Sequence, residues 1–229
     1  MTRVVILGRG KMGRMVAELA PAMGFEVVAR LGAADTANGL TREAVAGAEV
    51  AIEFTVPTAA AMLVRACADL SLPVVSGTTG WDAERTAAEA HVREHDGALL
   101  WAPNFALGMH LFAKVVQDAA RRFVAAGFTA RMTETHHTKK LDAPSGTARM
   151  LAGLAERASG KAVPITSVRT GEVPGTHEFF LEGAFEEVRL VHEAKDRRVF
   201  ASGALAAARW LVGRRGVFTL DDYLGEVSR

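Results

Sequence analysis

Residues 3–13 decide the fold of the first half of the chain; they read Arg3-Val4-Val5-Ile6-Leu7-Gly8-Arg9-Gly10-Lys11-Met12-Gly13. Its β-branched start predicts a buried strand, and the helical spacing of apolar residues over 11–23 predicts a helix. Between them the glycines follow the pattern G-x-G-x-x-G. The first glycine permits a tight turn, the second admits a pyrophosphate close to the backbone, and the third lets the helix pack on the strand. A helix N-terminus also attracts phosphate. We therefore predict a dinucleotide site at Gly8, Arg9, Gly10, Lys11, Met12 and Gly13.

The rest of the first half repeats the alternation of strand and helix. Further strands are expected at residues 26–31, 49–55, 73–76 and 98–101, and helices at 57–70 and 82–95. Strands that alternate with helices through short connections are typical of a parallel sheet covered by helices on both faces. The first half is therefore predicted to be an α/β domain.

After Pro103 the pattern changes to strands that follow one another more closely. We expect helices at residues 107–124, 145–159 and 197–212, a polar loop at 135–144, and strands at 129–134, 165–169, 177–181 and 187–191. Such an order predicts an α+β domain with a mixed or antiparallel sheet. The predicted boundaries are 1–106 for the first domain, completed by a C-terminal helix at 207–229 that packs back on it, and 107–206 for the second.

Composition places the chain among ordinary globular proteins. Of 229 residues 49% are hydrophobic and 23% charged, with a formal net charge of +1. That balance predicts no general attraction to nucleic acid or membranes. No apolar run reaches the roughly 18–20 residues that span a bilayer. The single cysteine, Cys67, allows no intrachain disulfide, and the first strand leaves no room for a signal peptide. These features favour a cytoplasmic protein.

The type of dinucleotide depends on the end of the second strand. The acid that usually holds the ribose 2′-hydroxyl is missing there, since Glu26 lies too early and Asp35 too late. Arg30, with Arg9 and Lys11, could instead bind a 2′-phosphate, which favours NADPH over NADH. The alternative is that Arg30 is merely solvated and that either cofactor is accepted.

Two more loops follow strands at the sheet edge where α/β proteins bind ligands. One is Gly77-Thr78-Thr79-Gly80, and the other is Ala102-Pro103-Asn104-Phe105. Threonine hydroxyls and bare backbone suit a carboxamide or a ribose. For either loop taken alone, ordinary turn chemistry is an equally good interpretation.

Ionisable and hydroxyl side chains are most concentrated at residues 134–147, which read ETHHTKKLDAPSGT. His136 and His137 are adjacent at a strand end, so they point to opposite sides and should have different roles. Histidine exchanges protons near neutral pH, and Lys140 can supply a proton or hold a carboxylate. Ser145-Gly146-Thr147 opens a helix whose N–H groups can bind an anion. We predict a site that protonates and binds a carboxylate substrate; a solvated basic loop before a capped helix is the alternative. With no cysteine nearby, no metal site is predicted.

The string from Glu134 to Ala148 matches E-x-H-H-x-x-K-x-D-x-P-S-G-T-A at every fixed position, and in this the chain resembles the 4-hydroxy-tetrahydrodipicolinate reductase (dihydrodipicolinate reductase) family. The resemblance extends to residues 77–80 and 102–105 and to scattered positions from Ser167 to Leu211. It implies that His136 is the general acid/base and Lys140 the proton donor. It also implies that His137, Gly146 and Thr147 bind substrate. Residues 8–13, 77–79 and 102–105 would line the nicotinamide dinucleotide.

The same resemblance implies a Rossmann-like domain and a mixed-sheet domain that binds a small dicarboxylate and builds a homotetramer. The implied reaction is NAD(P)H-dependent reduction of the cyclic imine from 4-hydroxy-tetrahydrodipicolinate, in diaminopimelate and lysine biosynthesis. Three departures stand out: a glycine loop one residue shorter than the commoner form, Glu53 in place of an aspartate, and the absent acid after the second strand.

Two other functions remain open at this point. One is a different imine or amino-acid dehydrogenase, such as an aspartate dehydrogenase-like enzyme, which would share the first domain but would not need the His136–Lys140 loop. The other is a catalytically silent dinucleotide-sensing module, although such modules tend to lose catalytic side chains and this chain keeps them.

Overall fold

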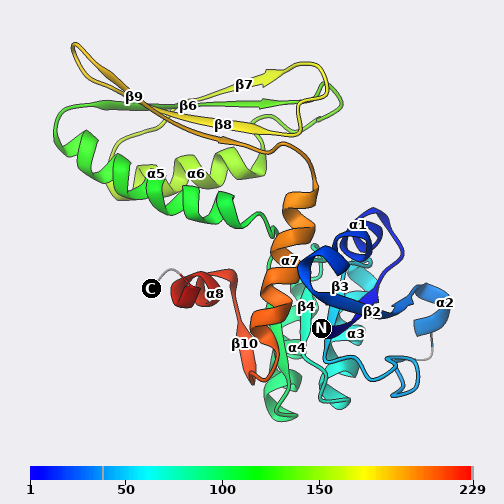
Figure 1. Ribbon diagram of the computed structural model, residues 1–229. Coiled ribbons are helices and arrows are strands. Elements are labelled where there is room, and N and C mark those ends of the chain that lie inside the picture. The colour runs from blue at the N-terminus through cyan, green and yellow to red at the C-terminus, as the bar shows by residue number, and fades with distance from the viewer. Residues whose placement is uncertain (38, 228–229) are drawn as a thin grey trace. The chain divides into compact units, whose positions relative to one another are not determined.

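A computed structural model describes residues 1–37 and 39–227, and the chain forms two compact units (Figure 1). The first unit consists of Met1–Leu107 together with the segment that begins at Arg198, and the second is Gly108–Arg197. The predicted boundary between residues 206 and 207, where the chain re-enters the first domain, falls inside helix α7 (Arg198–Leu211). The whole of this helix belongs to the first unit. Residues 228–229 of the predicted C-terminal helix lie outside the described residues.

The first unit is built on a six-stranded parallel sheet. The strand order is β10-β5-β4-β3-β1-β2, and every neighbouring pair is parallel. The predicted α/β class is therefore confirmed. The strands are β1 (Thr2–Leu7), β2 (Phe25–Leu31), β3 (Val50–Glu53), β4 (Val74–Ser76), β5 (Ala98–Trp101) and β10 (Gly216–Phe218).

Helices cover both faces of this sheet, because its central strands are apolar on both sides. Val4 and Ile6 of β1 lie in one buried cluster, with residues of α1 and α7, while Val5 and Leu7 lie in another, with residues of α3 and α4. Each strand therefore contributes alternate side chains to two separate cores. The helices are α1 (Lys11–Leu19), η1 (Pro21–Met23), α2 (Ala33–Thr36), α3 (Pro57–Asp69), α4 (Asp82–Glu94), α7 and α8 (Leu220–Val227).

Helix α7 packs closely against the loop after β5 because of one glycine. A Cβ atom added at Gly203 would lie 1.8 Å from the backbone oxygen of Phe105. The alanines of α7 on the same side are fully buried with the first core cluster. The helix thus joins the first unit through backbone contact, which explains why it is not divided between the units.

The second unit contains a four-stranded mixed sheet with the order β7-β6-β8-β9. The pair β6–β7 is parallel, and the pairs β6–β8 and β8–β9 are antiparallel, which confirms the predicted mixed sheet. Helices α5 and α6 lie along one face (Figure 1). The elements are α5 (Leu107–Ala125), β6 (Thr129–His136), α6 (Gly146–Ser159), β7 (Ile165–Arg169), β8 (Thr176–Glu182) and β9 (Glu187–Glu193).

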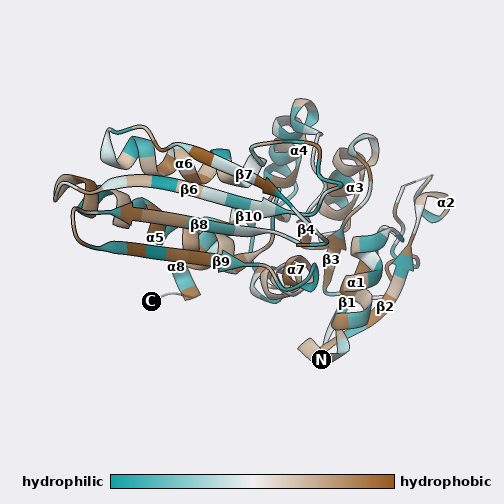
Figure 2. Cartoon of the chain, turned by 90° about the horizontal axis from the view of Figure 1, so that it is seen from above, coloured by the Kyte–Doolittle hydropathy of each residue, from teal (hydrophilic) through white to brown (hydrophobic). Residues whose placement is uncertain are grey.

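The other face of this sheet carries both charged and apolar side chains, and Figure 2 looks onto it. The guanidinium groups of Arg131 and Arg189 lie 3.8 Å and 5.3 Å from the centre of the Phe180 ring. Val191 is 49% exposed. This alternation along β6 and β9 is the pattern of strands with one buried side.

The structure differs from the predicted elements in several places. Strand β6 continues through His136, so the predicted polar loop begins two residues later than expected, at residue 137. The predicted C-terminal helix is instead the short strand β10 followed by α8. Helix α2 was also missed, since a single turn leaves no periodicity to recognise. Among the described residues, no helix is long and apolar enough to cross a membrane.

The close contact at Gly203 yields a prediction about stability. Gly203→Ala should lower the free energy of unfolding by about 1–3 kcal/mol, because the new methyl group collides with backbone that cannot rotate away. Urea denaturation of the variant measures this change. Gly225→Ala in α8 is the matched control, since a Cβ there meets no described heavy atom within 4 Å, and it should stabilise by about 0.5–1 kcal/mol. Equal effects of both substitutions would contradict the assigned packing.

Candidate active site

The glycine loop of the first unit has the geometry of a phosphate cradle. Gly8 has φ +115°, and a Cβ there would lie 2.0 Å from the Phe54 oxygen; at Gly13 it would lie 2.0 Å from the Gly8 oxygen. At Gly10, in contrast, a Cβ would have no heavy atom of the described residues within 4 Å. Helix α1 begins at the next residue, and no described side chain caps it. The outer glycines are therefore held by packing, whereas the middle one faces open space that suits a pyrophosphate.

The other predicted residues of this loop have different surroundings. Lys11 is exposed, and Met12 packs against the first core cluster. Arg9 donates to the backbone oxygen of Arg30 at 3.0 Å and pairs with Asp35 at 2.9 Å. Asp35 also accepts from the Gly32 N–H at 2.7 Å, so this acid lies beside the loop even though the sequence placed it too late. Arg30 is exposed at the end of β2.

A buried carboxylate supports the loop after β4. Glu53 is fully buried and accepts from the hydroxyls of Ser76 and Thr78, both at 2.6 Å, and from the N–H of Thr55 at 2.8 Å. The backbone oxygen of Thr78 also accepts from the indole N–H groups of Trp81 and Trp101. Thr78 therefore has internal partners and supports the loop, while Thr79 is exposed.

Phe54 connects the three predicted cofactor segments. Its backbone oxygen lies against Gly8, and its ring would be 2.0 Å from a Cβ at Gly77. The ring also meets Phe105 edge-on at 6.1 Å. In the third segment Ala102 and Phe105 are buried, Pro103 is exposed, and the Asn104 side-chain oxygen accepts from the Ala106 N–H at 2.8 Å. The structure thus brings residues 8, 77 and 105 together at the carboxyl ends of β1, β4 and β5.

In the second unit, a buried carboxylate organises the end of strand β6. Glu134 and His136 are two residues apart, so both side chains project from the same side of the strand, and Glu134 is fully buried. Its carboxylate contacts Nδ1 of His136 and accepts from a guanidinium N–H of Arg169 at 2.8 Å. It also receives a longer bond, 3.4 Å, from the N–H of Ser145. A carboxylate bound to Nδ1 fixes the imidazole orientation and leaves Nε2 free to exchange a proton.

The two groups shift each other's titration. Burial raises the pKa of Glu134, but hydrogen bonds from Arg169, Ser167 and His136 outweigh burial and lower that pKa to about 2. For His136 burial prevails: it lowers the pKa below 6.5, and the Glu134 carboxylate raises that pKa by a smaller amount. Glu134 is therefore ionised at neutral pH, and His136 is mainly neutral there.

His177 packs against this pair. Its ring meets that of His136 edge-on at 5.3 Å, and its Nε2 lies 3.4 Å from the Ser145 hydroxyl. Burial, followed by the charge of His136, lowers the pKa of His177 to about 4. His177 is thus neutral near pH 7, so it adds no positive charge beside His136.

The loop that carries Lys140 is fixed by Arg169. Its guanidinium donates to the backbone oxygens of Lys140, at 3.3 Å, and of Asp142, at 2.6 Å. The Lys140 ammonium itself lies 2.7 Å from the Asp142 carboxylate. One arginine therefore connects the loop to the Glu134 carboxylate, and Lys140 and His136 share that support.

The start of helix α6 is open, as an anion site requires. Ser145 caps the helix by accepting from the Ala148 N–H at 3.1 Å, while Gly146 is exposed and Thr147 half-buried. A Cβ at Gly146 would meet no described heavy atom within 4 Å. His137 is half-buried, and its Nδ1 atom is buried without a partner among the described residues. The second unit thus brings all five predicted catalytic and substrate-binding residues to one region around the end of β6.

Family models match both halves of the chain. The model described as "Dihydrodipicolinate reductase, N-terminus" matches residues 2–105, and "Dihydrodipicolinate reductase, C-terminus" matches residues 108–224. The chain belongs to the dihydrodipicolinate reductase family. A 4-hydroxy-tetrahydrodipicolinate reductase of Christiangramia forsetii is 32% identical, with 99% of each chain covered. One from Thiobacillus denitrificans is 34% identical, with 97% of this chain and 98% of that one covered.

Solved structures agree with the fold. Dipicolinate-bound dihydrodipicolinate reductase from Paenisporosarcina sp. TG-14 gives a TM-score of 0.81 at 24% identity, covering 96% of this chain and 97% of that one. An amine dehydrogenase from Mycobacterium smegmatis gives 0.63 at 11% identity, with 96% and 95% covered. The predicted family is confirmed, and with it the prediction that the protein is a nicotinamide-dependent reductase.

Three residues that shape the site of this reductase have no role predicted from the sequence. Glu134 stood in the motif without a role, and neither Arg169 nor His177 was assigned one. The alternation of β6 could have linked Glu134 to His136, since both lie on one side of the strand. Arg169 and His177 could not be found this way, because β7 and β8 pair with β6 only in the folded sheet.

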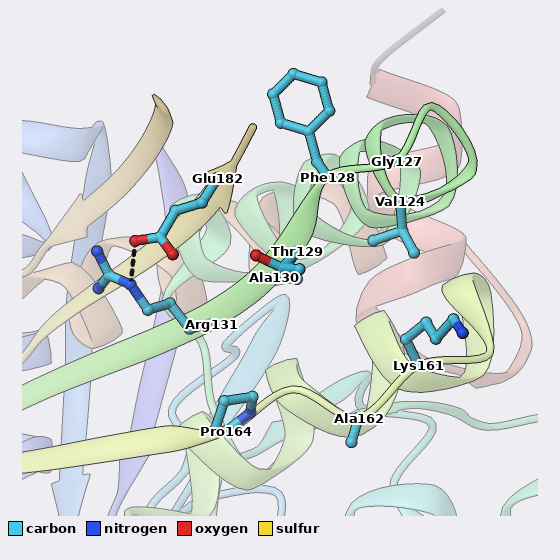
Figure 3. Close-up of a pocket in the computed structure, with 10 residues that line it drawn as sticks. All are labelled: Val124, Gly127, Phe128, Thr129, Ala130, Arg131, Lys161, Ala162, Pro164 and Glu182. Atoms are coloured by element: carbon cyan, nitrogen blue, oxygen red, sulfur yellow. Dashed lines mark hydrogen bonds and ion pairs between the residues drawn. The ribbon is translucent and has the colours of Figure 1, made fainter. Parts of the chain in front are cut away.

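A surface pocket of about 570 Å³ lies at the other end of strand β6 (Figure 3). Its lining includes Phe128, Thr129 and Pro164, and an ion pair of 2.7 Å joins Arg131 to Glu182 at its side. His136 is the last residue of β6 and Thr129 the first. The length of the strand therefore separates this pocket from the candidate active site.

The Glu134–His136 contact predicts the direction of a titration shift. The carboxylate raises the pKa of His136, so Glu134→Gln should lower that pKa further and reduce the protonated fraction at any pH near 6. An NMR titration of the imidazole C–H signal measures it. Glu182→Gln is the control, because Glu182 pairs with Arg131 and should leave His136 unchanged. An unchanged or raised pKa in Glu134→Gln would show that the contact does not govern His136.

Proposed function

We propose that the chain catalyses the NAD(P)H-dependent reduction of 4-hydroxy-tetrahydrodipicolinate, through its cyclic imine, to tetrahydrodipicolinate in diaminopimelate and lysine biosynthesis. The observation that carries this proposal is the buried Glu134–His136 pair beside the Lys140 loop and the open start of α6. A proton-exchanging imidazole, an ammonium and an anion-binding helix start are what reduction of a dicarboxylate imine requires.

Proton supply falls to His136 and Lys140. A bound nicotinamide would supply the hydride, and the imine would gain electron density as the hydride arrives. Since Glu134 occupies Nδ1 of His136, proton exchange takes place at Nε2. Lys140 is held near the carboxylate of Asp142, which keeps an ammonium proton donor in place. Arg169 keeps both groups on one support, because it binds Glu134 and the backbone of the Lys140 loop.

Substrate carboxylates are held at the start of α6. The N–H groups of Gly146 and Thr147 open the helix, and its dipole favours an anion there. His137 adds a buried nitrogen that lacks a partner among the described residues. The relative from Paenisporosarcina is described with dipicolinate bound, and dipicolinate is a dicarboxylate of the same class.

The first unit binds the dinucleotide. Gly8 to Gly13 hold the pyrophosphate, and residues 77–79 and 102–105 complete the site with backbone groups and the exposed Thr79. NADPH is preferred over NADH, because the exposed Arg30 lies at the end of β2, where it could bind a 2′-phosphate, and Arg9 donates to its backbone oxygen. A cytoplasmic homotetramer is the assembly that the family resemblance implies, and it is part of this proposal.

The assignment of His136 and Lys140 predicts a loss of turnover. His136→Ala and Lys140→Ala should each reduce kcat by about 100-fold or more, which is the usual contribution of a general acid–base group. The assay couples the chain to dihydrodipicolinate synthase and follows NAD(P)H absorbance. Lys139→Ala is the matched control, since the neighbouring lysine is exposed and pairs only weakly with Glu172 at 3.2 Å. Near-normal turnover in both variants would overturn the assigned roles, and no turnover by the wild type would overturn the function.

The cofactor proposal is tested separately. Arg30→Ala should raise the dissociation constant for NADPH by about tenfold or more, because a charge-assisted bond to phosphate is worth about 1.5–3 kcal/mol, while that for NADH changes little. Fluorescence titration of the free enzyme with each cofactor measures both constants. Arg93→Ala on α4 is the control, since Arg93 pairs with Glu89. Equal effects of Arg30→Ala on the two cofactors would remove Arg30 from the phosphate site.

A further inference from the structure

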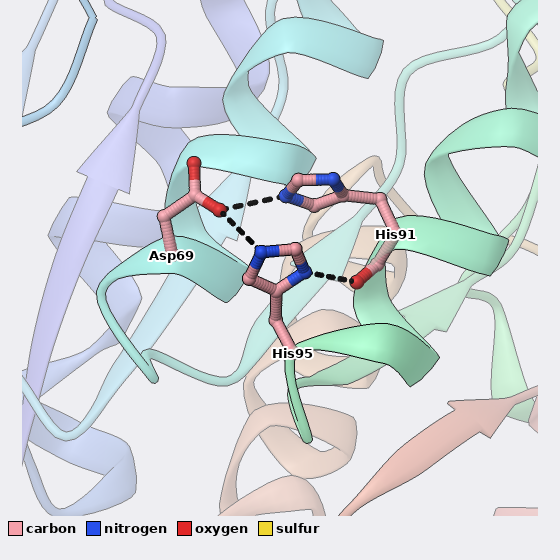
Figure 4. A group of neighbouring side chains, drawn as sticks. All are labelled: Asp69, His91 and His95. Atoms are coloured by element: carbon pink, nitrogen blue, oxygen red, sulfur yellow. Dashed lines mark hydrogen bonds and ion pairs between the residues drawn. The ribbon is translucent and has the colours of Figure 1, made fainter.

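Three ligand-type side chains of the first unit meet at the ends of two helices (Figure 4). Asp69 is the last residue of α3, His91 lies in the last turn of α4, and His95 follows that helix. The predicted cofactor loop at residues 77–79 precedes α4, and Phe54, which packs against that loop, precedes α3, so the cluster lies at the opposite ends of these helices. It is therefore a different place from the dinucleotide site.

The ligand atoms of this cluster converge on a common point. One carboxylate oxygen of Asp69 and one ring nitrogen of each histidine all lie within 4.8 Å of one another. Oδ1 of Asp69 is 2.6 Å from Nε2 of His91 and 3.6 Å from Nε2 of His95. The histidines are four residues apart on one helix face, the spacing that places two imidazoles around one metal ion.

A hydrogen bond to the backbone fixes the tautomer of His95. Its Nδ1 lies 2.9 Å from the backbone oxygen of His91, which can only accept, so Nδ1 carries the proton. In the neutral ring Nε2 then turns a lone pair toward the Asp69 carboxylate. Such a bond from the second nitrogen to a carbonyl is the usual support of a metal-binding histidine.

The two histidine rings lie against each other. They are stacked, with centroids 3.9 Å apart and 21° between their planes. A single cation between the two Nε2 atoms and the carboxylate satisfies all three groups at once.

The helix dipoles add a second reason for a cation here. Asp69 places a carboxylate at the C-terminus of α3, the end where negative charge is unfavourable, and α4 ends beside it. The backbone carbonyls and the carboxylate together make the potential negative at this point. A bound divalent cation removes this conflict.

We propose that Asp69, His91 and His95 bind a divalent transition-metal ion of the zinc class, with water completing a tetrahedral shell. Zinc takes nitrogen ligands at about 2.0–2.1 Å and carboxylate oxygens at about 2.0–2.2 Å, and all three side chains have room to adjust because they are partly exposed. The ion joins the ends of α3 and α4 and stabilises the first unit. No metal site is predicted from the sequence, where the histidines near Lys140 have no cysteine beside them.

Calorimetric titration of the full-length protein with zinc chloride at pH 7.5 tests this site. The wild type should bind one zinc ion, and His91→Ala, His95→Ala and Asp69→Asn should each weaken that binding by at least about 100-fold, because losing even an outer partner costs about 10–100-fold. His110→Ala is the control, since it removes a histidine outside the cluster and should bind zinc as the wild type does. Equal zinc affinity in the wild type and the three cluster variants would overturn the proposal.

Thermal unfolding provides an independent readout. Saturating zinc should raise the Tm of the wild type and of His110→Ala, because a ligand that binds only the folded state stabilises it, and it should leave His91→Ala unshifted. An identical shift in His91→Ala would place the ion elsewhere and refute the site. The cluster variants should keep the reductase turnover, so failure of the metal site and failure of the proposed function give different results.

Discussion

The second unit depends on keeping one carboxylate out of water. Burying an ionised acid is costly unless it is fully paired, and Glu134 meets this condition through Arg169 and His136. The same contacts determine where the imidazole points and hold the Lys140 loop through the second set of bonds from Arg169. Removing one partner would leave a charge buried and unpaired, so the network forms as a whole. His136 at the strand end and the loop of Lys140 are thereby held by the same network.

The first unit uses a related solution with neutral donors. Glu53 is fully buried beneath the predicted cofactor loops and accepts from the hydroxyls of Thr55, Ser76 and Thr78 and from a backbone N–H. Its carboxylate accepts from the hydroxyl of Thr78, which follows the neighbouring strand β4. In both units a buried acid at the carboxyl end of a central strand supports the loops of a predicted site. A rigid polar centre beneath a loop is how a flexible segment acquires a defined position.

Several side chains changed meaning once their partners were visible. Thr78 looked like a ligand-binding hydroxyl, but that hydroxyl bonds to Glu53. Asp35 looked too distant to matter, yet a one-turn helix brings it back to Arg9 and Gly32. A hydroxyl or carboxylate in a loop has no fixed direction in the sequence. Its partner depends on how the backbone turns, and short elements such as α2 and β10 leave no periodic signal.

The sequence by itself determined the repeating features: the strand–loop–helix of residues 3–23, the parallel α/β order, the mixed sheet and the motif at 134–148. These follow from local periodicity and from glycines whose Cβ would collide, as at Gly8 and Gly13, so they can be read along the chain. Only the tertiary structure decided which distant residues meet. Arg169 lies 35 residues from Glu134, and Asp69 lies 22 residues from His91. Their pairing depends on strand register and on where helices end, and these are set by packing between segments that no local pattern connects.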